Sequence, residues 1–344
     1  MVLRHSAAQQ LPQIITPQTT VLKIAITADC ILRCDGCLYG RDFMKQQKLS
    51  LESVQQVLED ASKMYVTNIM FYGGEPLMHP GLPEMIKKTV ACQMAPQMTT
   101  NGVLLKEKID GLYEAGLRNI GIGFYGVGDA YDKYVAKPGS FERLDKSLAY
   151  VREQYGDSVN LTICWLLNAK SCTVKSLEEA WAFTEKYDCR FNVSLADHSI
   201  PYFTYGQDGD LEFTESDSVR LNWVVEKMLQ YKKEQPERFS MSLPSIRSIP
   251  DWFRLGKDMP VPCNAYRRIW IAADGSVQLC NVTFKLGNIN EQRLSEILNT
   301  REHKKAVQDA FKLNCPNCNC GYAARIDEHG ASLRLYGQNL TPIG

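Results

Sequence analysis

The stretch VLKIAITADCILRCDGC, residues 21–37, runs from an apolar segment directly into three cysteines, Cys30, Cys34 and Cys37. Residues 21–27 have the composition of a short buried strand, so the cysteines are predicted to lie in a loop after it. A structural zinc ion takes four protein ligands, and a disulfide framework takes an even number of cysteines. Three thiols in one loop instead favour an iron–sulfur cubane, normally held by four thiolates, with one iron left open to another molecule.

Downstream of this loop, strand-like and helix-like segments alternate as far as residue 196. Strands are predicted at 21–27, 68–72, 97–100, 119–125, 159–167 and 190–196, and helices at 51–65, 82–94, 105–116, 141–155 and 176–187. Such alternation indicates a parallel α/β sheet with right-handed crossovers. Six strands are fewer than the eight of a closed barrel, so a partial barrel and a doubly wound sheet both stay open on the pattern alone.

In either arrangement the functional loops follow the carboxyl ends of the strands. The cysteine loop follows the first strand, Gly73-Gly74-Glu75-Pro76 follows the second, and Thr100-Asn101-Gly102 follows the third. Three unusual loops are therefore predicted to meet at one rim.

Composition excludes several classes of partner. The 344 residues contain 39 basic and 39 acidic side chains, which argues against nucleic acid or an anionic membrane. No apolar run approaches the roughly 18 residues of a membrane span, and the first 20 residues lack the apolar core of a secretory signal. We therefore expect a cytoplasmic protein, whose twelve cysteines serve metal or redox chemistry more than disulfides.

The spacing Cys30-x3-Cys34-x2-Cys37 after a first strand, with Gly73-Gly74-Glu75-Pro76 after a second, resembles the radical S-adenosylmethionine (radical SAM) superfamily. The resemblance covers roughly residues 20 to 200. It implies a partial (β/α)6 TIM-like barrel and a [4Fe–4S] cluster whose open iron binds S-adenosylmethionine. It further implies an external one-electron reductant such as flavodoxin or ferredoxin, and a 5′-deoxyadenosyl radical that removes a hydrogen atom from substrate.

The same resemblance assigns residues to S-adenosylmethionine. The Gly73-Gly74-Glu75-Pro76 loop is expected to meet its amine, through backbone carbonyls and the acidic side chain. Lys137 stands where relatives often place an arginine, and is expected at the carboxylate. Asn101 either lines the pocket or is a plain left-handed turn residue.

Two positions depart from the family pattern. Gly36 stands where an aromatic residue commonly covers the adenine, so Tyr39 is a substitute for it or else a packing residue of the loop. On the fourth strand, GFYG at 123–126 replaces a motif with serine and aspartate, which puts the ribose contacts in doubt.

A second set of cysteines lies near the C-terminus: Cys263, Cys280, Cys315, Cys318 and Cys320. Cys280 follows a hairpin signal at Asp274–Gly275. Taken alone, four such thiols are typical of a structural zinc site. The spacing resembles the SPASM/twitch auxiliary domain, and the shortage of later cysteines favours one [4Fe–4S] cluster that relays electrons. Whether Cys318 or Cys320 is the fourth ligand stays open.

These observations divide the chain into a lead-in (1–20), a radical SAM barrel (21–197), a linker with helices (198–262) and an auxiliary-cluster domain (263–344). Cys164 and Cys172 flank the end of the fifth predicted strand, and are weak candidates for a hydrogen donor to a substrate radical. Asp197 and His198, just past the sixth strand, are candidates for substrate contact.

The resulting prediction is a radical SAM oxidoreductase or isomerase. Its expected substrate is a small polar molecule such as a sugar, aminocyclitol or related natural product, which is dehydrogenated or epimerised. Only about 20 residues precede the first strand, too few for a leader-peptide-binding domain, so maturation of a ribosomal peptide is the alternative. A non-catalytic zinc protein is the alternative from another class.

Overall fold

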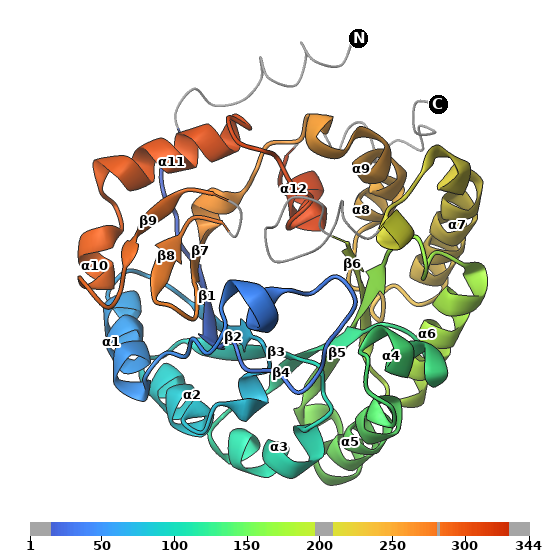
Figure 1. The fold of residues 1–344 in the computed structure, drawn as a ribbon, viewed down its shortest axis with the longest axis horizontal. Coiled ribbons are helices and arrows are strands. Elements are labelled where there is room, and N and C mark those ends of the chain that lie inside the picture. Colours follow the sequence, from blue (N-terminus) through green and yellow to red (C-terminus); the bar gives the residue numbers. More distant parts are fainter. Residues whose placement is uncertain (1–14, 197–208, 281–282, 330–344) are drawn as a thin grey trace.

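The computed structural model describes residues 15–196, 209–280 and 283–329. Within them, six parallel strands lie in the order β6-β5-β4-β3-β2-β1. Their bounds are β1 (Val21–Thr27), β2 (Asn68–Gly73), β3 (Ala95–Thr100), β4 (Asn119–Phe124), β5 (Asn160–Leu167) and β6 (Arg190–Leu195). β1 and β6 do not pair, so the sheet is curved but not closed (Figure 1).

The connecting helices cover one face of this sheet. They are α1 (Leu51–Ser62), α2 (Leu82–Ala91), α3 (Leu105–Glu114), α4 (Asp129–Tyr134), α5 (Ser140–Tyr155) and α6 (Val174–Lys186). Figure 1 shows α1, α2, α3, α5 and α6 as a ring outside the strands, with α4 inside that ring, whereas a doubly wound sheet would have helices on both faces. The fold is therefore the partial barrel, as predicted.

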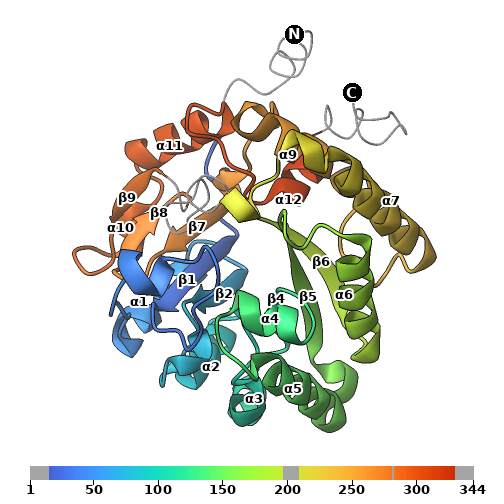
Figure 2. The ribbon, with the colours of Figure 1, turned by 45° about the vertical axis from the view of Figure 1, so that its right-hand side comes forward.

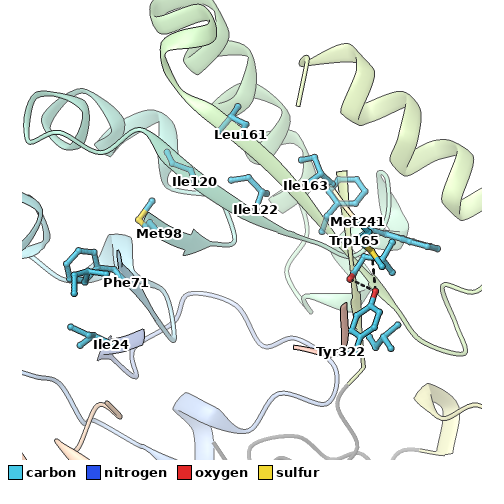
Figure 3. Packing of buried hydrophobic residues seen from close by; sticks show 14 of the residues in the cluster. Ile24, Phe71, Met98, Ile120, Ile122, Leu161, Ile163, Trp165, Met241 and Tyr322 are labelled. Carbon is cyan, nitrogen blue, oxygen red and sulfur yellow. Dashed lines mark hydrogen bonds between the residues drawn. The ribbon is translucent and has the colours of Figure 1, made fainter. Parts of the chain in front are cut away.

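The packing between strands and helices follows from the alternation along each strand. In β4, β5 and β6 every second side chain is buried, and these are the apolar residues that face the helices. Ile24, Phe71, Met98, Ile122 and Ile163 extend this core across the sheet (Figure 3). Most alternate positions are half-buried, and on β5 and β6 all of these except Leu166 are polar or small.

The segment that follows the barrel is helical. It contains α7 (Ser218–Glu234), α8 (Leu243–Arg247) and α9 (Ile249–Leu255). α7 packs on α6 and continues the outer ring (Figure 2).

The last part of the chain holds β7 (Arg268–Ile271), β8 (Ser276–Gln278), β9 (Lys285–Asn288), α10 (Leu294–Ile297), α11 (Arg301–Phe311) and α12 (Tyr322–Glu328). β7 and β8 form the predicted hairpin, with Gly275 in the turn at φ 83°. β7 also pairs with β1 in parallel, with Lys23 opposite Trp270, so the sheet continues as β1-β7-β8-β9.

The same C-terminal part reaches the other edge of the barrel. The Tyr322 hydroxyl on α12 donates to the Val193 carbonyl of β6 at 2.9 Å (Figure 3). The Asn319 side chain donates to the Ala196 carbonyl, just past β6, at 2.8 Å. Residues after 262 thus contact both free edges of the six-stranded sheet.

Candidate active site

The cysteine loop after β1 is fastened at several points. The Arg33 and Asp35 amides donate to the carbonyls of Val135 and Tyr134, at 3.0 and 2.8 Å, which ties the loop to the end of α4. The Cys37 amide donates to the Cys34 carbonyl at 3.1 Å. These bonds bring Cys30, Cys34 and Cys37 together at the rim of the barrel, all three half-buried and free of disulfides.

The three thiols lie in surroundings that disfavour a bare thiolate. Burial raises the pKa of Cys30 to about 11, although a hydrogen bond from the Leu32 amide to its sulfur opposes the shift. Burial also raises the pKa of Cys34 and of Cys37, and for Cys34 the neighbouring Cys37 adds to the rise. Such thiols ionise when a metal centre binds them and stabilises the negative charge. The loop therefore fits a thiolate-ligated iron cluster.

The glycines of the second loop allow two backbone segments to lie unusually close. A Cβ on Gly74 would lie 2.4 Å from the carbonyl oxygens of Ala28 and Asp29, and Gly73 has a φ of 138°. The Glu75 amide donates to the Asp29 carbonyl at 2.7 Å. The close neighbour that requires these glycines is thus the segment leading into Cys30, and the loop is held against the cysteines.

Glu75 is fully buried, and its carboxylate is occupied by the protein itself. It accepts hydrogen bonds from the Thr100 hydroxyl at 2.6 Å, the Asn101 amide at 2.9 Å and the Leu77 amide at 3.0 Å. Burial raises the pKa of Glu75 to about 7 against these bonds. In the structure this carboxylate joins the loops after β2 and β3, and its contact with the amine of S-adenosylmethionine stays a prediction. Pro76 begins the short 3-10 turn Pro76–Met78 and is buried beside it.

Tyr39 lies where the first cysteine loop contacts the C-terminal part of the chain. It begins a short π-helical segment, Tyr39–Phe43, and is buried against Ala272 and Ala273 at the turn between β7 and β8. Its hydroxyl accepts a hydrogen bond from the Ala273 amide at 3.3 Å. These contacts are those of a packing residue, and the role of Tyr39 at the adenine stays a prediction.

Asn101 and Lys137 both reach the cysteine loop. The Asn101 side-chain amide lies 4.0 Å from the Cys30 sulfur, and its carbonyl oxygen accepts the Val103 amide at 3.0 Å. Left-handed φ falls on Gly102 at 75°, so Asn101 is not the turn residue. The Lys137 ammonium lies 3.4 Å from the Ile31 carbonyl, between Cys30 and Cys34 in sequence.

Sequence analysis missed Tyr125 as a residue of this site. Its ring stacks on Tyr134 with centroids 4.5 Å apart, and a Cβ on Gly123 would lie 2.7 Å from its hydroxyl oxygen. Burial and the nearby Cys34 raise the pKa of Tyr125 well above its ordinary value. The departure of GFYG from the family motif was the available signal, since Gly123 makes the room that the tyrosine hydroxyl occupies.

The second cysteine set also converges. Cys263, Cys280, Cys315, Cys318 and Cys320 line one cavity, together with Asn264, Arg268, Trp270 and Arg325. A zinc site would need its donors within about 2.3 Å of one point. In the described residues no three histidine, cysteine, aspartate or glutamate side chains are arranged to hold a single ion. Five thiols around one cavity are the ligand type that a thiolate-held metal centre requires.

One side chain of the inner face lies beside the auxiliary cavity. Lys23 on β1 places its ammonium 4.3 Å from the centre of the Trp270 ring, and Trp270 lines the auxiliary cavity. Burial, with the like charge of Arg268, lowers the pKa of Lys23 to about 8. Lys23 forms no ion pair with a carboxylate of the described chain.

The two weak catalytic candidates differ in position. Cys164 is half-buried on the inner-face side of β5, and its sulfur lies 3.6 Å from where a Cβ on Gly121 would be. Cys172 has no exposed surface and belongs to the apolar core. Asp197 and His198 lie outside the described residues.

None of the helices in the described ranges combines the length and the apolar character that crossing a bilayer requires.

Comparison with known proteins agrees with this geometry. The model of the radical SAM superfamily matches residues 24–169, and that of the SPASM iron–sulfur cluster-binding domain matches residues 263–320. A GTP 3′,8-cyclase of Chlorobaculum tepidum is 33% identical over 269 residues, which cover 75% of this chain and 77% of that protein. A GTP 3′,8-cyclase of Aquifex aeolicus is 26% identical, with 76% and 81% covered.

Solved structures show the same fold at low identity. Streptococcus suis SuiB bound to precursor peptide SuiA has a TM-score of 0.65 at 16% identity, over 85% of this chain and 67% of that one. The protein anSMEcpe with bound AdoMet has a TM-score of 0.63 at 15% identity, over 85% and 84%. Taken with the cysteine loops and the partial barrel, these matches show that the chain belongs to the radical SAM superfamily and carries a SPASM domain.

Proposed function

We propose that this enzyme holds two [4Fe–4S] clusters and removes a hydrogen atom from a small, polar, anionic substrate bound at the inner face of the barrel. Cys30, Cys34 and Cys37 would hold one cluster. Cys263, Cys280 and Cys315, with Cys318 or Cys320, would hold the other. When bound, the first cluster and S-adenosylmethionine supply the 5′-deoxyadenosyl radical. The outcome is dehydrogenation or epimerisation of the substrate.

The observation that carries this proposal is the polarity of the inner face. Strands of a parallel sheet buried on both sides are usually apolar throughout. Here six of the seven half-buried positions on β3, β5 and β6 are polar or small, namely Gln97, Thr99, Thr162, Cys164, Asn192 and Ser194, and the seventh is Leu166. Hydroxyl, amide and thiol groups in this number suit a hydrogen-bonding substrate.

The charge at the edge of this face supports an anionic group on that substrate. Lys23 and Arg268 act on each other as like charges beside the auxiliary cavity. One guanidinium nitrogen of Arg268 donates a hydrogen bond to Oδ1 of Asn264 at 2.7 Å, and this acceptor is neutral. A carboxylate or phosphate placed between the two cations would relieve their repulsion.

The protein's own groups also position S-adenosylmethionine. We assign its amine to the backbone carbonyls of the Gly73–Gly74 segment, and its carboxylate to the Lys137 ammonium. The Gly73–Gly74 segment lies beside the segment that carries Cys30, because Gly74 contacts Asp29. Lys137 lies beside the same segment, because its ammonium is close to the Ile31 carbonyl.

Cys164 is our candidate hydrogen donor if the reaction is an epimerisation. Its thiol faces the same side of the sheet as Thr99, since both approach Gly121 at 3.6 Å. Burial raises the pKa of Cys164 to about 11, which keeps the S–H bond intact at neutral pH. Cys172, enclosed in the core, is the weaker candidate.

A nucleotide is the second candidate substrate. The 33% identity to a GTP 3′,8-cyclase and the paired cations favour a purine nucleoside triphosphate, which would be cyclised and neither dehydrogenated nor epimerised. Peptide maturation has weaker support than either of these, because SuiB is only 16% identical to this chain and resembles it in fold alone.

Iron and sulfide analysis comes first, and about eight of each per chain is expected from two cubanes. The anaerobically reconstituted, reduced enzyme is then incubated with S-adenosylmethionine and one substrate class at a time: deuterated aminocyclitols and sugars, GTP, or a peptide. Deuterium in 5′-deoxyadenosine identifies the class that is attacked. Zinc in place of iron would refute the proposal. Label transfer from GTP alone, or from peptide alone, would show that the substrate is a nucleotide or a peptide and not a sugar or aminocyclitol.

A further inference from the structure

Arg325 is a buried cation in α12. Only 1% of its surface is exposed, and it is among the largest fully buried side chains. Its guanidinium donates to the carbonyls of Val261, Pro262 and Cys318, with 3.2 Å to Pro262.

Every partner of this guanidinium is electrically neutral. Besides the three carbonyls it donates to Oδ1 of Asn317 at 3.2 Å, and it lies over the Trp252 ring at 4.6 Å from the centroid. It forms no ion pair with a carboxylate in the described part of the chain. A charge buried without an opposite charge is costly, so the surroundings of Arg325 lack a counter-charge.

The position of Arg325 identifies where that counter-charge belongs. Arg325 lines the same cavity as the five C-terminal cysteines. It holds the carbonyl of Cys318 and those of the two residues that precede Cys263, so it bridges segments that carry cysteines of the set. Four thiolates around a cubane give the whole centre a net negative charge in either redox state.

We infer that Arg325 is the counter-charge of the auxiliary cluster and raises its reduction potential. Reduction adds one negative charge to the cluster, and a nearby buried cation stabilises that charge more than it stabilises the oxidised state. Arg325 is thus a positioning and tuning residue that favours acceptance of an electron at this cluster. The inference rests on the auxiliary cluster of the proposed function.

A purely structural role is the competing explanation. The guanidinium fork could serve only to join the Val261–Pro262 segment to Cys318. Under that explanation, removing the fork lowers stability and cluster content but leaves the potential of whatever cluster forms unchanged. The potential therefore separates the two roles.

The test is an EPR-monitored redox titration of the fully reconstituted protein. The signal that does not change on addition of S-adenosylmethionine is assigned to the auxiliary cluster. In Arg325→Gln we expect the ratio of reduced to oxidised auxiliary cluster to fall at least tenfold at a fixed potential, which is about 59 mV for a one-electron couple. Arg325→Lys, which keeps the charge, should stay close to wild type.

A second variant keeps the argument testable if Arg325→Gln does not fold. Asn317→Asp leaves Arg325 in place but puts a carboxylate 3.2 Å from the guanidinium, so it should also lower the potential. Arg267→Gln is the matched control, because Arg267 is 47% exposed and faces Glu328 at 3.6 Å. An unchanged auxiliary potential in Arg325→Gln and Asn317→Asp overturns the inference. Absence of any second cluster in wild type instead overturns the proposed function.

Discussion

The Tyr39 hydroxyl accepts a hydrogen bond from the backbone amide of Ala273 at 3.3 Å, across 234 residues of sequence. Tyr39 follows Cys37 by two positions, and Ala273 begins the turn of the hairpin that leads to Cys280. The bond therefore joins the loop of the first cysteine set to the domain that carries the second. Ala25, Ala28 and Met44 complete the small apolar cluster around it.

Removal of the Tyr39 ring should loosen the first cysteine loop. Tyr39→Phe keeps the packing and loses one hydrogen bond, so a loss of about 1 kcal/mol in the free energy of unfolding is expected. Tyr39→Ala should cost roughly 3–5 kcal/mol and lower the iron content of the first cluster. Thermal unfolding and iron analysis check both, with Tyr65→Ala as control because Tyr65 is 89% exposed. Equal stability of Tyr39→Ala and the control would contradict this role.

Glu75 should make the stability of the cluster-free chain depend on pH. Its folded-state pKa of about 7 lies above the ordinary value of 4.5, so the folded chain binds the proton more tightly between these values. The free energy of unfolding contributed by Glu75 therefore falls as pH rises from 4.5 to 7, by roughly 3 kcal/mol. Glu75→Gln cannot titrate, so wild type should lose stability relative to this variant between pH 5 and pH 8 in denaturant unfolding. A difference that stays constant across that range would count against the burial of a titrating carboxyl.

Lys23 should affect substrate binding more than the chemical step. Loss of a hydrogen bond to a charged group costs about 1.5–3 kcal/mol, so Lys23→Met should raise KM by roughly ten- to a hundredfold with a smaller change in kcat. Lys108→Met is the control, because Lys108 is exposed on α3. Steady-state kinetics with the substrate identified by label transfer measures both. An unchanged KM in Lys23→Met would contradict the proposed anion site at Lys23.

Cys164 and Cys172 can be separated by solvent isotope. If the reaction is an epimerisation, product formed in deuterated water should gain deuterium at the attacked carbon in wild type and in Cys172→Ala. Cys164→Ala should still cleave S-adenosylmethionine but lose that gain, because the thiol that donates hydrogen is absent. Mass spectrometry of the product gives the result. Retained deuterium in Cys164→Ala would assign the donor elsewhere.

Cys318 and Cys320 both line the auxiliary cavity, but a cubane needs only one of them beside Cys263, Cys280 and Cys315. Substitution of that one cysteine should remove a ligand, and substitution of the other should not. We expect either Cys318→Ala or Cys320→Ala, but not both, to lose about four iron ions per chain, since a cubane normally needs four thiolates. The other variant should keep about eight. Iron analysis with the EPR signal of the first cluster as internal reference decides between them. Full iron in both single variants would mean that the two cysteines substitute for each other.

Local signals predicted most of the barrel. Ser50, a residue type that favours helix N-caps, caps α1 with its hydroxyl accepting the Ser53 amide at 3.0 Å, and Gly116 takes a φ of 107° after α3. β3 begins at Ala95, earlier than predicted, although Pro96 has no amide to donate. β4 pairs with β3 only from Gln97 onward. Pro96 therefore has no pairing partner on β4, and its missing amide leaves no hydrogen bond to β4 unmade. α4, with six residues, is too short to give a helical period.

The parts that sequence could not predict depend on contacts between distant residues. Nothing in RIWI at 268–271 specifies that it pairs in parallel with β1 and not with a third strand of its own domain. The burial of Glu75 could not be read from Gly-Gly-Glu-Pro, because its three donors come from three different loop positions. Lys23 carried a usable signal: a single charge within an apolar strand faces the side that the helices do not cover.

Because β7 pairs with β1 and Tyr322 contacts β6, the C-terminal domain bridges the two edge strands of the open barrel. Cutting the chain before residue 263 would leave the β1 edge unpaired, as a template for intermolecular pairing, whereas the β6 edge would keep its bridge between Phe191 and Phe239. We therefore expect the barrel and the C-terminal domain to unfold together, because the domain completes the β1 edge and contacts β6.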